Sequence, residues 1–167
     1  MRWVAGIWML AAGVQPVTAK EWPVTAGWTI EENEERSGCR MDAFFGDDAR
    51  LRIDFFKNES PLLTVADRGL RSPATGSGGA ELSLDEGRTF HPSQIVYFTS
   101  EGTSGFIAPI NAFFVEQLMT ADSLTYVLPA LDYVKRLDVK NSGEAVSMLR
   151  RCVDEMPGAG SAAKAEN

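Results

Sequence analysis

Few residues in this sequence have both the type and the spacing that catalysis requires. His91 is the single histidine. Imidazole can act as a general base or a metal ligand, but the sequence offers it no obvious partner, so a histidine in a surface loop is the favoured interpretation. Residues 102–106 (Gly-Thr-Ser-Gly-Phe) lack the G-x-S-x-G spacing of a nucleophile elbow. Residues 75–79 (Thr-Gly-Ser-Gly-Gly) lack the Lys-Ser/Thr of a phosphate-binding loop and do not lead into a helix. The sequence therefore predicts no catalytic residue and no nucleotide-binding loop.

Two clusters of acidic residues could supply oxygen ligands. Carboxylates can hold Ca²⁺, and a facing pair can hydrolyse a glycosidic bond. Neither cluster has the spacing of an EF-hand, and solvated surface charge is the favoured interpretation of both. The sequence thus predicts no metal site and no cofactor site. The clusters are Glu31, Glu32, Glu34 and Glu35, and Asp47 with Asp48.

Aromatic side chains form the third group of candidates, because they could line a binding patch. For most of them, packing in the hydrophobic core is the favoured interpretation. Three Phe-Phe pairs, at residues 44–45, 55–56 and 113–114, are a separate feature. Neighbouring residues on a strand face opposite sides, so these pairs predict elements that are at least partly covered on both faces. The other candidate aromatics are Trp22, Trp28, Tyr97, Tyr126 and Tyr133.

The two cysteines, Cys39 and Cys152, are predicted to form a disulfide. Both lie downstream of the N-terminal apolar segment, and an even count leaves no unpaired thiol. Oxidising compartments favour such bonds. The alternative is a pair of buried free thiols. Metal binding is disfavoured, because neither cysteine belongs to a C-x-x-C pair and His91 is the sole histidine.

The first residues have the organisation of a secretory signal peptide. Arg2 supplies the positive end, residues 3–14 form an uncharged and mostly apolar stretch, and Pro16 precedes Val-Thr-Ala at residues 17–19. Cleavage is expected after Ala19. The apolar stretch is shorter than the roughly 20 residues that a membrane-spanning helix needs. The protein is therefore predicted to be periplasmic or secreted, with no membrane span after cleavage.

Composition indicates one acidic globular domain. The 167 residues are 44% hydrophobic and 23% charged, with a net charge of −7. That charge opposes binding to phosphate backbones and anionic lipid, and no basic run offsets it, so no nucleic-acid partner is expected. The length suits a single domain. The expected organisation is a signal peptide at residues 1–19, one α+β domain at 20–156 and a disordered tail at 157–167.

Period-two alternation of apolar and polar residues predicts a mostly antiparallel sheet of about six to eight strands. Residues 39–45 and 50–57 alternate on either side of Gly-Asp-Asp and predict a β-hairpin. Residues 69–79 are rich in Gly, Ser, Pro and Thr and are expected to form a loop, and residues 101–105 a turn. Further strands are expected at residues 27–30, 61–67, 80–85, 94–99, 123–128 and 131–139.

Helical spacing appears twice. A first helix is expected at residues 111–120. Asn141 and Glu144 have the spacing of a capping box that would begin a second helix. Apolar residues then recur at helical spacing and place Cys152 on the buried stripe. A disulfide to Cys39 would join this C-terminal helix to the sheet, which gives an α+β fold.

A tryptophan strand comes before the first cysteine, here Trp28 and Cys39, and the chain ends with a strand followed by a helix that holds Leu-Arg-x-Cys, here residues 149–152. In these features the sequence resembles a group of small secreted bacterial proteins of unknown function. By size, location and cysteine placement it is also similar to periplasmic proteins of the invasion-associated locus B type. Both likenesses imply a periplasmic protein. They bring no assigned activity, cofactor or catalytic residue.

Together these features predict a secreted periplasmic protein without catalytic activity that binds a protein or an envelope component. An exposed aromatic or acidic surface is the expected site of contact. Two alternatives stay open at this point. One is a carrier of a small ligand or a metal ion, and the other is an envelope hydrolase that uses carboxylates.

Overall fold

A computed structural model describes residues 22–23, 25–33, 36–73, 75–85, 87, 89–100 and 102–156. Within these residues the chain forms eleven strands in two sheets, two α-helices and one short 3₁₀ turn, η2 (Pro129–Leu131). The α+β class predicted from the sequence is confirmed, although the strands divide between two sheets where one was expected. The predicted signal peptide (1–19) and the C-terminal tail (157–167) lie outside the described residues.

The larger sheet has seven strands, and every neighbouring pair is antiparallel. The predicted hairpin is present as β2 and β3, joined by the turn at residues 46–48. Along β2 and β3, side chains such as Met41, Leu51 and Ile53 are fully buried on the inner face. Across the sheet the order is β1 (Trp28–Asn33), β2 (Gly38–Phe45), β3 (Ala49–Phe56), β4 (Leu62–Asp67), β9 (Thr103–Pro109), β8 (Ile95–Ser100) and β5 (Thr75–Gly78).

The smaller sheet has four strands and contributes to the same core. The Tyr126 ring on β10 packs edge-on against the Phe106 ring of β9, with 5.5 Å between the ring centroids. This contact joins the inner faces of the two sheets. The strand order is β11 (Tyr133–Asp138), β10 (Ser123–Leu128), β6 (Glu81–Leu84) and β7 (Thr89–Phe90).

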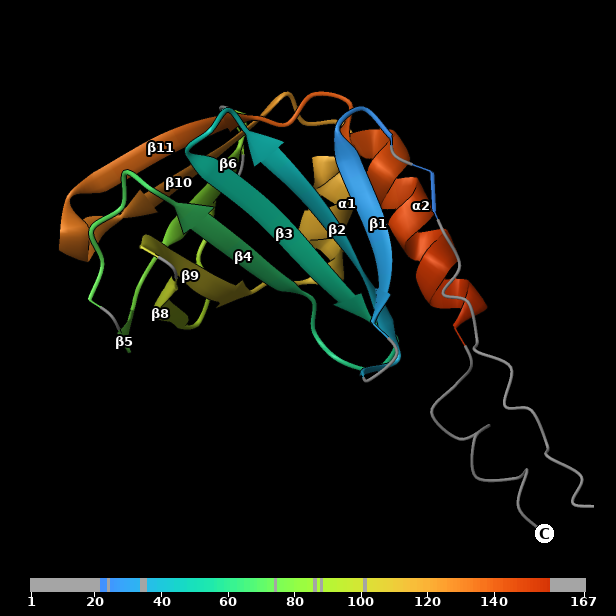
Figure 1. The fold of residues 1–167 in the computed structure, drawn as a ribbon, viewed down its shortest axis with the longest axis horizontal. Helices are drawn as coiled ribbons and strands as arrows, with labels where there is room; N and C mark the ends of the chain where they lie inside the picture. The colour runs from blue at the N-terminus through green and yellow to red at the C-terminus, as the bar shows by residue number, and fades with distance from the viewer. Residues whose placement is uncertain are drawn as a thin grey trace, which may run out of the picture.

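The two helices cover the inner face of the seven-stranded sheet. In Figure 1, α1 (Ala112–Leu118) and α2 (Ser142–Glu155) lie behind β1, β2 and β3, and the face toward the viewer carries no helix. Helix α2 contacts β1, β2, β3 and α1. A Cβ on Gly143 would lie 2.5 Å from the Met119 carbonyl oxygen. Glycine at this position therefore lets α2 begin directly against the end of α1.

The predicted disulfide is confirmed. Cys39 on β2 and Cys152 on α2 are bonded, with 6.1 Å between their Cα atoms and a separation of 113 positions in the sequence. Both residues are fully buried. The bond therefore fastens the C-terminal helix to the sheet, as the position of Cys152 on the apolar stripe of the helix indicated.

The capping box predicted at Asn141 and Glu144 is wrong. Asn141 adopts a left-handed conformation (φ 66°), and its side chain makes no capping hydrogen bond. Asn141 is the N-cap residue of α2, as expected, but it lies in the tight turn after β11, which the Ser142 N–H closes on the Val139 carbonyl oxygen at 3.1 Å, so the capping hydrogen bond is absent. The side-chain cap occurs instead on α1, where Asn111 Oδ1 accepts from the Phe114 N–H at 2.8 Å.

Three strands were not anticipated. Residues 75–78 form the edge strand β5 inside the segment expected to be a loop, and β9 begins at Thr103 inside the expected turn. The two-residue strand β7 also had no sequence signal. In β5 and β9 glycines lower the intrinsic strand propensity. Pairing with β8, and for β9 also with β4, supplies the missing stabilisation.

Candidate ligand-binding site

One row of residues crosses the outer face of the seven-stranded sheet, and its side chains differ greatly in size. The strand registers place Phe44, Arg50, Ala66, Gly105 and Phe98 side by side on β2, β3, β4, β9 and β8. Large side chains stand at the two ends of this row and the two smallest stand in the middle. Among the described residues no helix or sheet covers this face (Figure 1). A hollow therefore lies open to solvent between the large side chains.

Gly105 is required for this shape. A Cβ at Gly105 would lie 2.4 Å from Cζ of the Phe98 ring and 2.2 Å from the Val65 carbonyl oxygen. The Phe98 ring therefore lies across the backbone of β9, in space that any other residue at position 105 would occupy. Phe98 forms one wall of the hollow, Gly105 gives room for its ring, and the small side chain of Ala66 leaves the middle open.

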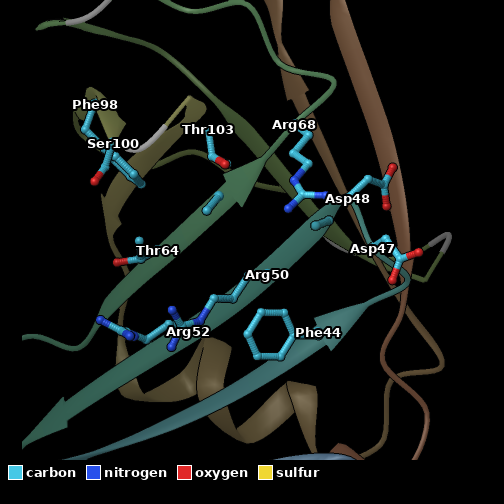
Figure 2. A pocket seen from close by; sticks show the side chains of 12 residues that line it. Phe44, Asp47, Asp48, Arg50, Arg52, Thr64, Arg68, Phe98, Ser100 and Thr103 are labelled. Atoms are coloured by element: carbon cyan, nitrogen blue, oxygen red, sulfur yellow. The ribbon is translucent and has the colours of Figure 1, made fainter.

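The hollow has a volume of about 490 Å³. Ligand pockets in proteins run from about 300 to 1,000 Å³, so this one is large enough for a small organic molecule. Figure 2 shows Arg50 and Arg52 together on β3 beside the Phe44 ring, with Phe98, Ser100 and Thr103 across the hollow. The lining residues are Phe44, Asp47, Asp48, Ala49, Arg50, Arg52, Thr64, Ala66, Arg68, Phe98, Ser100 and Thr103.

Two of the lining arginines share one carboxylate. Arg50 Nε lies 2.7 Å from Asp42 Oδ1 and its Nη2 donates to Oδ2, while Arg52 donates to Oδ2 from Nε at 3.2 Å and Nη2 at 3.1 Å. Asp42 is only 5% exposed. The hydrogen bond to Asp42 is the main reason that the pKa of Arg50 is raised. One carboxylate against two guanidinium groups leaves a net positive charge at this wall.

Phe44 corrects an expectation about the Phe-Phe pairs. Phe45 is half-buried and packs edge-on against Trp28, with 5.9 Å between centroids. Phe44 points the other way and is 71% exposed. It gains only a cation–π contact, because the Arg50 guanidinium carbon lies 5.1 Å from its ring centroid. The outer face is therefore uncovered at this residue, and a large apolar ring faces solvent at the rim of the hollow.

Arg68 and three hydroxyl groups complete the polar lining. Arg68 follows β4 directly, and its backbone N–H donates to the Asp48 carbonyl oxygen at 2.8 Å. Within the described part of the chain, its guanidinium has no carboxylate within ion-pair distance. Thr64, Ser100 and Thr103 bring side-chain hydroxyls to the same hollow. The hollow thus offers three cationic groups and three hydroxyls as hydrogen-bond donors.

Acidic groups stand at one end of the hollow. Asp47 and Asp48 belong to the turn between β2 and β3, and both are exposed. Lys135 of β11 lies 2.8 Å from Asp48 Oδ2 and balances its charge. Lys135 also lies 3.1 Å from Oδ1 of Asp67. This lysine therefore connects the end of the hollow to a buried polar cluster beneath it.

Asp67 is the centre of that cluster and has no solvent exposure. Its carboxylate accepts from the hydroxyls of Tyr126 and Tyr133 (2.7 Å to the latter), from Gly69 N at 2.8 Å and from Lys135. Burial acts to raise the pKa of Asp67, but these hydrogen bonds outweigh it and hold the pKa below its usual value. Since Asp67 belongs to β4 and its partners to β10 and β11, the cluster joins the two sheets.

The tyrosines give a direct test of this arrangement. Burial is the larger cause and the hydrogen bond to Asp67 the second cause that raise the pKa of Tyr133 to about 12. The same two causes raise the pKa of Tyr126. Burial alone raises the pKa of Tyr97. These are all three tyrosines of the chain. A raised pKa stabilises the fold up to about pH 10, the ordinary tyrosine value, and that stability is lost as pH rises through the folded-state value.

We therefore expect the native protein to bind its tyrosine protons above the ordinary range. Tyr97 should ionise above pH 10, and the two tyrosines bonded to Asp67 should ionise only as the pH approaches 12, together with loss of the folded circular-dichroism signal. The same titration in denaturant should show all three groups ionising near pH 10. A native titration with one tyrosine ionising near pH 10 would contradict the cluster or the burial of Tyr97.

The residues singled out from the sequence lie mostly elsewhere. His91 is exposed in the segment after β7. Of the first acidic cluster, Glu31 is exposed on β1 and Glu32 accepts from Trp22 Nε1 at 3.3 Å, while Glu34 and Glu35 lie outside the described residues. Core packing is confirmed for the four aromatic residues that are buried, and Tyr133 is half-buried. The buried four are Trp22, Trp28, Tyr97 and Tyr126.

Of the residues considered in the sequence analysis, Asp47 and Asp48 line the hollow, together with Phe44 of the first Phe-Phe pair and Thr103 of residues 102–106. Its arginines were not singled out from the sequence. The signal that could have found them is the spacing of Arg50 and Arg52, which puts both on the strand face that also carries Phe44. The walls and floor depend on cross-strand neighbours from five strands, which local spacing does not reveal.

Comparison of the chain with protein-family models, with curated proteins and with solved structures gives no match. Among the described residues, no helix is long and apolar enough to cross a membrane. What the site can bind therefore follows from its own geometry.

Proposed function

We propose that this chain is a non-catalytic binding protein whose ligand occupies the hollow on the outer face of the seven-stranded sheet. The observation that carries this proposal is the row from Phe44 to Phe98. It combines a small-residue floor, aromatic walls and three guanidinium groups, of which two share Asp42, on a face that nothing else in the described chain covers. These are the features of a ligand pocket, in which apolar surface supplies affinity and a few polar groups fix orientation.

The location proposed for this protein is the periplasm or the extracellular space. The disulfide between Cys39 and Cys152 supports that location, because such bonds persist in oxidising compartments. The signal peptide with cleavage after Ala19 stays a prediction. Intact mass of the secreted protein would test it, since cleavage and disulfide formation each change the mass by a defined amount.

The size of the hollow favours a small ligand over a broad protein partner. A stable protein interface buries about 800 Å² on each partner, whereas the hollow is the size of a single small molecule. Carboxylate-based hydrolysis needs two acids that face each other across the substrate. Asp47 and Asp48 are neighbours in one exposed turn, and Lys135 engages one of them, so their placement does not favour that reaction.

Photo-crosslinking in the native host tests the proposed site. p-Benzoylphenylalanine replaces Phe44 in one variant and Phe113, an exposed phenylalanine on α1, in the matched control. After illumination, intact mass should show an adduct of defined mass at position 44 and none at position 113. Adducts at 113 alone, equal adducts at both positions, or no adduct at 44 would each contradict the proposal.

A further inference from the structure

Arginine side chains gather on the wall of the hollow although the whole chain is acidic, and the two acidic lining residues, Asp47 and Asp48, stand together at one end. Three of the twelve lining residues are arginines, in a protein with a net charge of −7. Arg50 and Arg52 hold one carboxylate between them. Arg68 faces the same hollow from the end of β4, and no described carboxylate pairs with its guanidinium. A free guanidinium group is a strong donor to carboxylate, phosphate or sulfonate oxygens, often through two parallel hydrogen bonds.

The apolar walls add a second requirement. Phe98 lies across Gly105 on one side, and Phe44 stands on the other side beside Arg50. Between them the floor is Ala66, because the Phe98 ring covers Gly105. Aromatic faces prefer flat partners in offset or edge-on contact. A ring placed over Ala66 would lie between these two aromatic side chains.

The acidic groups at the end of the hollow limit the ligand further. Asp47 and Asp48 are exposed beside the site, and the net charge of the chain repels extended polyanions. A nucleic acid or a highly charged polysaccharide would meet these carboxylates, whereas one compact anionic group beside the arginines would not.

We infer that the hollow binds a small organic anion in which a flat apolar ring carries one acidic group. The ring lies on the floor between Phe44 and Phe98, and the acidic group accepts hydrogen bonds from Arg68 and the Arg50–Arg52 pair, with Thr64 and Thr103 within the same lining. This inference rests on the proposed function and adds the chemical class of the ligand.

Two fluorescent probes that share a ring system provide the test. 8-Anilinonaphthalene-1-sulfonate carries a sulfonate, and N-phenyl-1-naphthylamine is the same structure without it. The affinity of the folded, disulfide-bonded protein is measured for both by fluorescence titration at low ionic strength. The sulfonate probe should bind about tenfold or more tightly than the neutral probe, because hydrogen bonds to charged groups are the stronger ones.

Three variants separate the parts of the site. Arg68→Gln should weaken binding of the sulfonate probe about tenfold and leave the neutral probe within about twofold. Arg136→Gln is the matched control, because it removes the same charge from an exposed position on β11 outside the hollow, and it should leave both probes unchanged. Phe44→Ala should weaken both probes by a similar factor of about three or more, through loss of one wall. Circular-dichroism melting curves check that each variant is folded.

The outcomes separate the ligand class from the site itself. Equal affinity for the two probes, with both weakened by Phe44→Ala, would overturn the anionic class and leave the hollow as the binding site. If Arg68→Gln and Arg136→Gln lost the same sulfonate-probe affinity, the loss would come from the overall charge of the protein. That result would also overturn the anionic class. The inference would be overturned if the sulfonate probe did not bind, or if neither Phe44→Ala nor Arg68→Gln changed its binding. The crosslinking result at position 44 would still decide the proposed function.

Discussion

Replacing both cysteines by alanine should lower the free energy of unfolding by about 4–5 kcal/mol, on the basis of the loop that the disulfide closes. Cys39 and Cys152 are 113 residues apart and hold the last helix on the sheet. Without the bond, the unfolded chain can adopt more conformations, so its conformational entropy rises and the unfolded state becomes more favourable. Urea unfolding of the Cys39→Ala/Cys152→Ala variant, compared with the parent protein, measures this difference.

Two controls isolate the covalent bond. Treating the parent protein with a reductant keeps the sulfur atoms in place and should reproduce most of the loss, whereas Ser147→Ala, on the exposed side of α2, should change stability by less than about 0.5 kcal/mol. A loss below about 1 kcal/mol for both the double variant and the reduced protein would show that packing alone holds α2 on the sheet.

Replacing Asp67 by alanine should cost about 3–5 kcal/mol, the range observed when one partner of a buried charge pair is removed. The change leaves the buried Tyr126 and the half-buried Tyr133 without their shared acceptor, and it leaves Lys135 with Asp48 as its one remaining carboxylate partner among the described residues. Urea unfolding at neutral pH measures the loss. Tyr133→Phe, which removes one neutral donor and keeps the ring, should cost only about 1 kcal/mol. Equal effects of the two substitutions would contradict the central role assigned to Asp67.

The same carboxylate predicts a pH dependence. Burial acts to raise the pKa of Asp67, and the hydrogen bonds from Tyr126, Tyr133, Gly69 and Lys135 outweigh it, so the folded-state pKa is lower than the ordinary value. A lowered pKa contributes stability above the unfolded-state value of about 3.9, and this contribution is lost as pH falls through the folded-state value. Part of the acid destabilisation of the parent protein below about pH 4 should therefore be missing in Asp67→Ala. Parallel acid profiles for the two proteins would contradict this.

The features that the sequence predicted well depend on local patterns. Alternation around residues 46–48 predicts the β2–β3 hairpin, and helical spacing puts Cys152 on the buried side of α2. The disulfide follows because two cysteines allow one intramolecular pair. The hairpin and helix signals lie within a few residues of the feature, and the disulfide needs only the count of cysteines.

The features that the sequence did not predict depend on distant partners. Strand β9 carries a glycine and ends at a proline, and it is a strand because β4 and β8 pair with its two edges. Asn141 has the residue type of a helix cap, but the turn after β11 gives it a left-handed backbone. Tertiary context overrides the local preference at both places.

The candidate site shows the same limit more strongly. The row from Phe44 to Phe98 joins residues of five strands, and its shape depends on Gly105, which gives room for the Phe98 ring, and on Ala66 beside it in the register. Neither residue carries chemistry, so a search of the sequence for reactive groups passes over both. The arginines form a candidate anion site only because they stand beside this hollow, and Asp42 neutralises part of their charge.

The central claim is that the outer face of the seven-stranded sheet binds the ligand, and amide chemical-shift mapping tests it most directly. A ¹⁵N-labelled sample of the disulfide-bonded protein is titrated with 8-anilinonaphthalene-1-sulfonate while the amide signals are followed. The account predicts that the largest shifts belong to Arg50, Ala66, Phe98, Thr103 and Gly105, with α1 and β11 nearly unaffected. Shifts centred on Phe113 of α1 or Val134 of β11, which are also exposed apolar residues, with the row from Phe44 to Phe98 unchanged, would contradict it.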